Sequence, residues 1–240
     1  MSVRVGVGRA WAQPARRRRA PGAGQERKVA LKGPGLLFVV SGPSGAGKDT
    51  VVEALRERMP RLRYSVSATT RAPRPGELEG ESYFFTDRTA FEERMKRGEF
   101  LETREYNANL YGTPRSFVEQ RLLEGYDVIM KPEVNGALAI KSAFPAAVLI
   151  FLLPDRFSYL QRRLDERRTE TSEEIAARLA IAHQEYSAIP AFDYVLINEQ
   201  APPEKLGQLP AVDDLEAILH AERFRIHHYS NDDFRKLRES

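Results

Sequence analysis

A glycine-rich segment at residues 42–50 carries the residue types of a phosphate-binding loop. Its sequence, Gly-Pro-Ser-Gly-Ala-Gly-Lys-Asp-Thr, has the glycine and lysine spacing of a P-loop. Glycines let backbone N–H groups wrap around phosphate oxygens, and Lys48 can reach the β and γ phosphates of a nucleoside triphosphate. We therefore predict an ATP site that is formed by Gly42, Pro43, Ser44, Gly45, Ala46, Gly47, Lys48, Asp49 and Thr50.

A P-loop connects a buried strand to a helix, and the residues on its two sides match both elements. Residues 36–40 are a continuous apolar run, as expected for a strand that is covered on both faces of a parallel sheet. After Asp49 the apolar residues follow a helical period as far as Pro60. Further core strands are predicted at 126–130, 147–153 and 192–198, and a helix at 213–224. These elements predict an α/β fold with a parallel core sheet.

Position 49 departs from the P-loop motif, because aspartate stands where serine or threonine is usual. The usual hydroxyl ligates Mg²⁺, and a carboxylate can also ligate Mg²⁺, directly or through water. An aspartate at this place is equally explained by its favourable interaction with the helix N-terminus. Both interpretations stay open. Mg²⁺ is the predicted cofactor, with ATP as phosphoryl donor, and Asp49 is its candidate ligand.

Two arginines beside prolines indicate a second anion site. Arg71 and Arg74 lie in the segment Thr-Thr-Arg-Ala-Pro-Arg-Pro-Gly-Glu at 69–77. Guanidinium groups that are held in a stiff loop suit a phosphate dianion. Surface ion pairs would be the default explanation for either arginine alone, but the segment has few acids. We therefore expect a second phosphate-bearing substrate here.

From about Leu36 to about Asn198 the chain resembles the guanylate kinase family. The matching motifs occur in the family's order at 42–50, 65–77, 80–85, 99–102 and 110–113. The Ser-Val-Ser-Ala-Thr-Thr-Arg stretch that begins at Ser65 is the specific part of this match, since a P-loop occurs in many unrelated kinases and ATPases. The resemblance implies a P-loop three-layer fold with a small GMP-binding insertion at 67–117 and a helical lid at 155–180.

The resemblance also assigns residues to substrates. It implies GMP binding by Ser67, Arg71, Arg74, Tyr83, Glu102, Tyr111, Thr113 and Glu133, and an adenine contact by Asn198. The catalytic residues that it implies are Lys48, Arg71, Arg167 and Arg178, the last two in the lid. One carboxylate can accept hydrogen bonds from guanine N1–H and N2–H₂ together. Adenine lacks that pair of donors, so Glu102 would reject it.

The segment after the predicted strand at 126–130 departs from the family. Lys131 and Glu133 stand where two acids are usual, and Pro132 removes a backbone donor. Glu133 is expected to keep part of the acidic role, whereas Lys131 cannot act as a carboxylate.

Charge is distributed unevenly along the 240 residues. Residues 1–34 hold nine of the 37 basic residues and one of the 34 acids, so the rest of the chain carries a net charge of −5. We predict that 1–34 is a disordered basic extension. It is open whether this extension is a basic arm, a targeting segment or without function. The kinase domain is predicted at 35–200, with core segments at 35–66, 118–154 and 181–200, followed at 201–240 by a helix and a solvated tail that includes His227 and His228.

Composition excludes several classes of protein. Cysteine is absent, which excludes disulfide scaffolds, thiolate metal sites and cysteine nucleophiles. No apolar run approaches the roughly 18 residues that span a bilayer, so a cytoplasmic protein without a membrane partner is expected. The basic extension is the only candidate for nucleic-acid binding, which we do not expect of the folded part.

The expected reaction is the Mg²⁺-dependent transfer of the ATP γ-phosphoryl group to GMP, giving ADP and GDP, by a monomer or homodimer. A guanylate-kinase-like protein-binding module without activity is the alternative, and a kinase for another nucleoside monophosphate is a third interpretation. Intact Lys48, Arg71, Arg74, Arg167 and Arg178 favour the enzyme, whereas the departures at Asp49 and Lys131 weakly favour the module. Glu102 with Thr113 favours GMP as the acceptor.

Overall fold

The computed structural model of the 240-residue chain describes residues 35–155, 181, 183–199, 210–232 and 235. The predictions for the extension at 1–34, for the lid beyond residue 155, and for Arg167 and Arg178 lie outside these residues.

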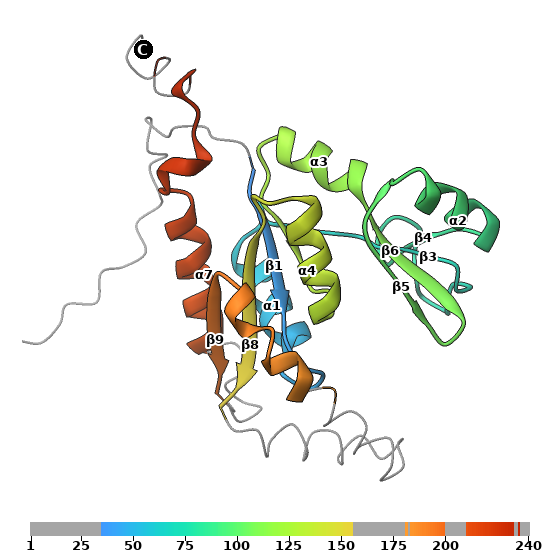
Figure 1. Cartoon of the computed structure of the whole chain (residues 1–240), viewed down its shortest axis with the longest axis horizontal. Coiled ribbons are helices and arrows are strands. Elements are labelled where there is room, and N and C mark those ends of the chain that lie inside the picture. The colour runs from blue at the N-terminus through green and yellow to red at the C-terminus, as the bar shows by residue number, and fades with distance from the viewer. Residues whose placement is uncertain (1–34, 156–180, 182, 200–209, 233–234, 236–240) are drawn as a thin grey trace, which may run out of the picture. The chain divides into compact units, whose positions relative to one another are not determined.

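A five-stranded sheet in the order β2-β7-β1-β8-β9 forms the core. Its strands are β1 (Leu37–Ser41), β2 (Arg63–Tyr64), β7 (Val128–Met130), β8 (Val148–Pro154) and β9 (Tyr194–Asn198). Every pairing in this sheet is parallel. The α/β class and the parallel core sheet are thus confirmed (Figure 1).

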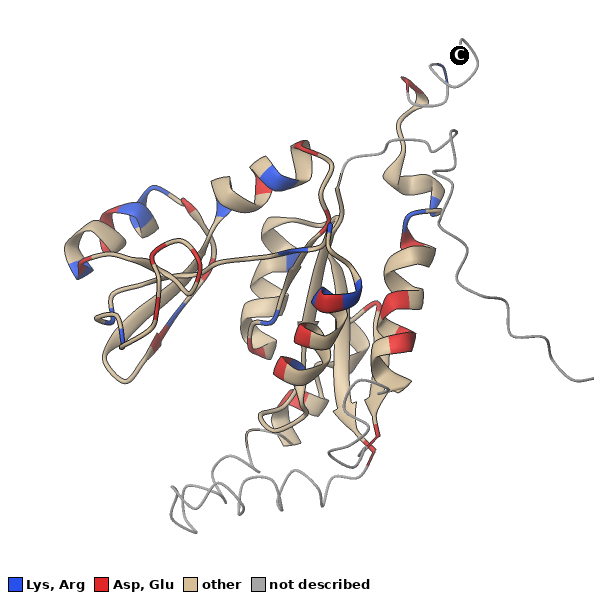
Figure 2. Cartoon of the chain, turned by 180° about the vertical axis from the view of Figure 1, so that it is seen from behind, with Lys and Arg blue, Asp and Glu red and all other residues tan. Residues whose placement is uncertain are grey.

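Successive side chains of β1 point to opposite faces of this sheet, and those from Leu37 to Val40 are all apolar, so both faces are covered by helices. Phe38 and Val40 pack with α1 (Lys48–Arg58) and α7 (Pro210–Glu222) on one face. Leu37 and Val39 pack with α3 (Arg115–Leu123) and α4 (Val134–Ala143) on the other. The charged residues lie mainly on the helices and on the second sheet, while the core strands are almost uncharged (Figure 2).

A second sheet, in the order β4-β3-β6-β5, is built from the residues between β2 and α3. Its strands are β3 (Ala68–Thr69), β4 (Phe84–Phe85), β5 (Phe100–Tyr106) and β6 (Asn109–Pro114). The helix α2 (Arg88–Lys96) lies between β4 and β5 in the sequence. A separate small core supports it, in which the rings of Phe91 and Phe100 stack with centroids 4.5 Å apart. Gly112 permits this packing, since a Cβ there would lie 3.0 Å from both rings.

The C-terminal part differs from the solvated tail that the sequence suggested. Two short 3₁₀ helices, η1 (Ile189–Ala191) and η3 (Ile226–His228), flank β9 and α7. Glu222 at the end of α7 is fully buried, and His228 Nε2 lies 2.8 Å from its carboxylate. The prediction was wrong for His228, whose side chain is only 6% exposed. A buried carboxylate attracts donors from a nearby segment, a contact that polarity along the chain does not reveal.

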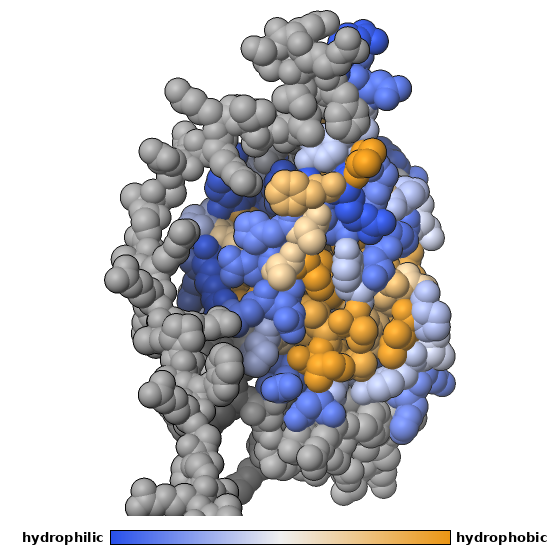
Figure 3. Space-filling view, turned by 90° about the vertical axis from the view of Figure 1, so that its left-hand side faces the viewer, coloured by the Kyte–Doolittle hydropathy of each residue, from blue (hydrophilic) through white to orange (hydrophobic). Residues whose placement is uncertain are grey.

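The edge strand β9 exposes the apolar residues Val195 and Ile197. The face that includes this edge carries an apolar patch (Figure 3). In the part of the chain that the structure describes, helices are too short or too polar to cross a membrane.

Candidate functional site

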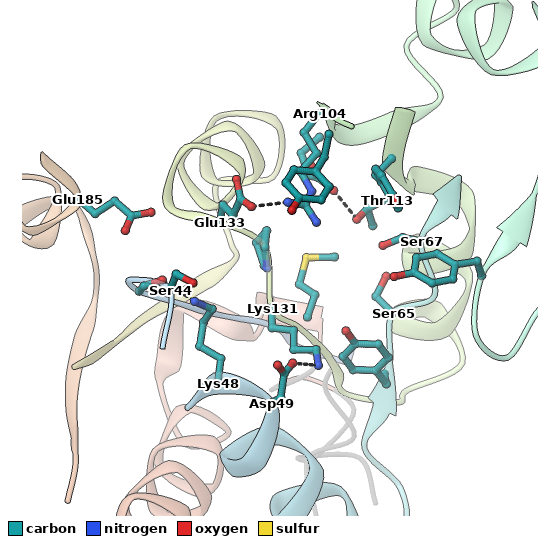
Figure 4. A pocket seen from close by; sticks show the side chains of 18 of the residues that line it. Ser44, Lys48, Asp49, Ser65, Ser67, Arg104, Thr113, Lys131, Glu133 and Glu185 are labelled. Atoms are coloured by element: carbon teal, nitrogen blue, oxygen red, sulfur yellow. Dashed lines mark hydrogen bonds and ion pairs between the residues drawn. The ribbon is translucent and has the colours of Figure 1, made fainter. Parts of the chain in front are cut away.

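A cavity of about 600 Å³ lies where the P-loop end of the core sheet faces the second sheet (Figure 4). The core side contributes Gly42, Ser44 and Lys48 from the loop after β1, together with residues that follow β7. The second sheet contributes Glu102 from β5 and Thr113 from β6, among others. Segments that are far apart in sequence therefore form one site, as expected at the carboxyl ends of parallel strands.

The P-loop conformation depends on its first and last glycines. Gly42 has φ of +139°, and a Cβ there would lie 2.2 Å from the carbonyl oxygen of Leu152. Gly47 adopts the left-handed region at the start of α1, with φ of 92°. These two positions turn the chain sharply from β1 into α1. The loop consequently faces the cavity with the helix N-terminus behind it, the arrangement that binds phosphate.

Lys48 is the cation of this loop. Its ammonium group donates hydrogen bonds to the carbonyl oxygens of Gly42, at 2.5 Å, and Pro43, at 3.0 Å. Burial lowers the pKa of Lys48, and the carboxylates of Glu185 and Asp49 oppose that effect. The lysine thus bonds to the loop itself, from which its flexible stem can move to phosphate oxygens.

Asn198, at the end of β9, contacts the outside of the P-loop. Its amide nitrogen donates to the carbonyl oxygen of Ala46 at 2.8 Å, and the residue is 4% exposed. Its amide oxygen has no hydrogen-bond partner among the described residues. Asn198 therefore fixes the loop to β9, and the predicted adenine contact stays a prediction.

Asp49 forms an ion pair with Lys131, the residue that follows β7. The two are 82 positions apart in sequence, and both line the cavity. The Lys131 ammonium also lies 5.5 Å from the ring centroid of Tyr64. The departure from the P-loop motif at Asp49 and the departure from the family at Lys131 are therefore neighbours in space.

Glu102 lies on the opposite side of the cavity. The Thr113 hydroxyl donates to its Oε1 at 2.8 Å, and burial raises the pKa of Glu102. Gly136 on α4 leaves room for it, since a Cβ there would lie 3.5 Å from Glu102 Oε2 and 3.1 Å from the Pro132 side chain. A partly buried carboxylate with one hydroxyl partner can accept further hydrogen bonds from a ligand.

Arg104 and Glu133 form an ion pair beside Glu102. The Arg104 guanidinium also lies 5.3 Å from the ring centroid of Tyr111, which lines the cavity. Arg104 follows Glu102 by two residues on β5, so both point to the same face. This period of two was the signal by which Arg104 could have been found from sequence.

The two predicted phosphate-binding arginines belong to a loop that is closed by Glu77. Arg71 donates to both carboxylate oxygens of Glu77, at 2.7 and 3.0 Å, and the backbone N–H of Arg74 donates to the same group at 2.7 Å. Hydrogen bonds from Arg71 and Arg74 lower the pKa of Glu77. The Arg71 guanidinium lies 5.4 Å from the ring centroid of Tyr83, which lines the cavity.

The structure brings most of the predicted side chains together, although not all of them face the cavity. The predicted residues that line it are Gly42, Ser44, Lys48, Asp49, Ser67, Tyr83, Glu102, Tyr111, Thr113 and Glu133. Those outside its lining are Pro43, Gly45, Ala46, Gly47, Thr50, Arg71, Arg74 and Asn198. The lining also contains residues that the motifs did not assign to the site, including Tyr64, Ser65, Arg104, Lys131 and Glu185. Ser65 begins the Ser-Val-Ser motif, and Arg104 and Lys131 also had signals in the sequence, whereas Tyr64 and Glu185 had none.

A P-loop at the end of a parallel sheet, facing a second sheet that presents the Glu102 carboxylate as a hydrogen-bond acceptor, defines a nucleotide-binding α/β protein of the nucleoside monophosphate kinase class. Comparison with known proteins narrows this class. The family described as guanylate kinase matches residues 35–208. The chain belongs to the guanylate kinase family.

Individual relatives agree with this assignment. A guanylate kinase from Desulfitobacterium hafniense is 44% identical over 192 residues, which are 80% of this chain and 92% of the relative. One from Trichormus variabilis is 45% identical over 187 residues, covering 78% and 87%. The crystal structure of guanylate kinase from Anaplasma phagocytophilum, 32% identical, superposes with a TM-score of 0.64 over 87% of this chain and 95% of that one.

Proposed function

We propose that this chain transfers the γ-phosphoryl group of ATP to GMP, giving ADP and GDP. The observation that carries the proposal is the shared cavity of the P-loop lysine, Lys48, and the Glu102–Thr113 pair. The first group binds phosphate and the second is suited to guanine, so donor and acceptor would meet in one site. Membership of the guanylate kinase family supports the same reaction.

Selection of guanine depends on the hydrogen bonds that Glu102 can still accept. Thr113 occupies one of its oxygens, and the carboxylate can accept further bonds from guanine N1–H and N2–H₂. Adenine would leave a partly buried charge without these donors, a loss of about 1–3 kcal/mol. Tyr111 and Tyr83, whose ring centroids are 6.0 Å apart, provide aromatic contact on the same side.

Phosphoryl transfer needs positioning and charge stabilisation more than a covalent nucleophile. Lys48 would leave the Gly42 and Pro43 carbonyls and contact the β and γ phosphates. Arg71 and Arg74 would place the GMP phosphate, with Glu77 holding their loop. The GMP phosphate is already ionised near pH 7, so no general base is required.

Mg²⁺ would accompany ATP and neutralise charge on its phosphates. Such an ion is usually held by one or two carboxylates and by phosphate oxygens. Asp49 fits that role in chemistry and position, because it lines the cavity beside Lys48. Its carboxylate is shared with Lys131, so the ion would compete with an ammonium group for it.

The alternative, a binding module without activity, is less well supported. A protein surface that only recognises peptides has no need of a lysine at a glycine-rich loop together with a carboxylate that faces a 600 Å³ cavity. We further propose that the enzyme acts in the cytoplasm, where ATP and GMP are available, as a monomer or homodimer.

The test is a coupled assay of ADP release with ATP, Mg²⁺ and one of GMP, AMP, UMP or CMP as acceptor. We expect kcat/KM to be highest for GMP, by a factor on the order of a hundred. Equal values for GMP and AMP, or turnover of ATP that no acceptor stimulates, would contradict the proposal.

A further inference from the structure

Lys131 occupies a place in the cavity to which neither the motifs nor the proposed reaction assign a role. It directly follows β7, and its ammonium reaches across to Asp49 at the start of α1. The side chain of Lys131 is 27% exposed, whereas that of Asp49 is 82% exposed. Lys131 is therefore held in the wall of the cavity, with its carboxylate partner toward solvent.

The ion pair with Asp49 uses only part of the hydrogen-bond donor capacity of the Lys131 ammonium group. A lysine ammonium has three N–H donors, and Asp49 accepts through one oxygen, Oδ1. An ion pair with so exposed a carboxylate is weak, so its geometry can adjust when an anion enters. Lys131 can therefore keep Asp49 and contact a phosphate oxygen at the same time.

A second feature of the same wall points to a polar ligand. Ser65 is 3% exposed and lines the cavity, and its hydroxyl has no hydrogen-bond partner among the described residues. Buried hydroxyls are normally hydrogen-bonded. Figure 4 shows Lys131 extending toward Asp49, with Ser65 and Ser67 on the adjoining wall.

Charge provides the third argument. Asp49 stands beside the P-loop lysine, Lys48, where the proposed reaction brings several phosphate charges. An unneutralised carboxylate there would repel them. Besides Lys48 and Lys131, the described cation that lines this cavity is Arg104, which is already paired with Glu133. Among the described residues, Lys131 is the cation that forms an ion pair with Asp49.

We propose that Lys131 is a second phosphate-binding lysine, and that Asp49 is the positioning residue that holds its ammonium beside the transferred phosphoryl group. The ligand is a nucleotide phosphate, either of ATP or of GMP. This inference rests on the proposed function for the identity of the nucleotides, but its chemistry requires only a phosphate in the cavity.

The test measures nucleotide affinity in EDTA, so that Mg²⁺ does not contribute. Isothermal titration of the full chain with ATP and, separately, with GMP compares the wild type with Lys131→Met and Lys131→Arg. Loss of a charged hydrogen bond predicts that Lys131→Met weakens binding of at least one nucleotide by about tenfold or more. Lys131→Arg keeps the charge and should stay within about threefold of the wild type.

Guanosine is the matched ligand without phosphate, and its affinity should be the same in all three proteins. The role of Asp49 is tested with Asp49→Asn and the double variant. Lys131→Met should weaken binding less when Asp49→Asn is already present, because no carboxylate is then left to repel the phosphates. Equal losses in the two backgrounds would remove the positioning role of Asp49.

Thermal melting monitors the fold of each variant, and Lys131→Gln replaces Lys131→Met if the latter does not fold. ATP and GMP affinities that both change by less than about twofold in the neutral variant would overturn the proposal. Failure of the proposed function is a separate result, since it would appear as absent GMP preference in the wild type while the ATP titration still reports on Lys131.

Discussion

Two glutamates, the partly buried Glu102 in the cavity and the fully buried Glu222 at the end of α7, differ in their hydrogen-bond partners. Burial favours the neutral form of both. Glu102 has one hydroxyl donor, Thr113, and its pKa is raised. Glu222 is buried more completely, but hydrogen bonds from Tyr194, His228 and Arg225 outweigh the effect of burial and lower its pKa.

This difference separates a carboxylate that holds the fold from one that is available to a ligand. Glu222 joins β9, through Tyr194, to the segment that follows α7, through Arg225 and His228. Its accepting capacity is largely used within the chain. Glu102 retains capacity on the side of the cavity, which is what a site for guanine requires. The number of internal donors is thus more informative than burial alone.

Glu222→Gln should have the largest effect on stability. The amide keeps one acceptor but presents N–H groups to donors, and it leaves Arg225 and His228 without a carboxylate. We expect the free energy of unfolding to fall by about 2–3 kcal/mol, toward the lower end for a broken buried pair because Arg225 is half-exposed. Urea denaturation measures this loss.

The matched control for that variant is Glu216→Gln on the same helix, whose partners Arg58 and His220 lie 3.7 Å away at the surface. It should lower the free energy of unfolding by no more than about 1 kcal/mol. The GMP-over-AMP preference should be unchanged in both variants. Equal losses of unfolding free energy in Glu222→Gln and Glu216→Gln would show that the buried cluster around Glu222 stabilises the fold no more than a surface ion pair does.

Glu102→Gln should reduce the preference for GMP and leave stability nearly unchanged. A carboxamide accepts at one atom and donates at the other, so one guanine donor loses its partner. The ratio of kcat/KM for GMP to that for AMP should fall by about 1–3 kcal/mol, or five- to 150-fold. Stability should change little, since the Thr113 bond can be kept.

Glu105→Gln is the control on the same strand, because Glu105 is exposed and pairs with Arg88 outside the cavity. It should leave the ratio unchanged. A Glu102→Gln enzyme with the wild-type ratio would contradict the assignment of Glu102 to guanine.

The fold and much of the site could be predicted from sequence because their signals are local. The run at 36–40 and the helical period after Asp49 gave β1 and α1 within one or two residues. Three further core strands were predicted from short apolar runs, and each overlaps an observed strand. The two-residue strands of the second sheet carry no comparable signal, since pairing partners rather than sequence pattern define them.

What sequence could not supply is which charged side chains pair with one another. Asp49 and Lys131 each looked like an isolated departure, and only the parallel arrangement of β1 and β7 brings them together. His228 was assigned to solvent because its own neighbourhood is polar, while its partner Glu222 is six residues away on a helix. Ion pairs of this kind depend on tertiary geometry, which periodicity does not encode.

The smallest of the expected effects is the pH dependence of stability and of guanine affinity, which also distinguishes the two glutamates. Glu222 has a lowered pKa in the folded state, so its contribution to stability is present above the unfolded value of about 4.3 and is lost as pH falls through the lower folded value. Glu102 has a raised pKa, so its contribution to stability has the opposite sign, and acidification does not unfold the chain through this group.

The ionised form of Glu102 is the one that accepts both guanine donors. Guanine affinity should therefore decline at a higher pH than stability does. Guanosine is the ligand for this measurement, because the GMP phosphate titrates near pH 6. Its dissociation constant between about pH 7.5 and 4.5, compared with circular dichroism of the same samples, should rise while the fold is intact, and Glu102→Gln should remove the rise. An affinity that stays constant until the circular dichroism signal is lost would show that Glu102 does not control guanine binding by its charge.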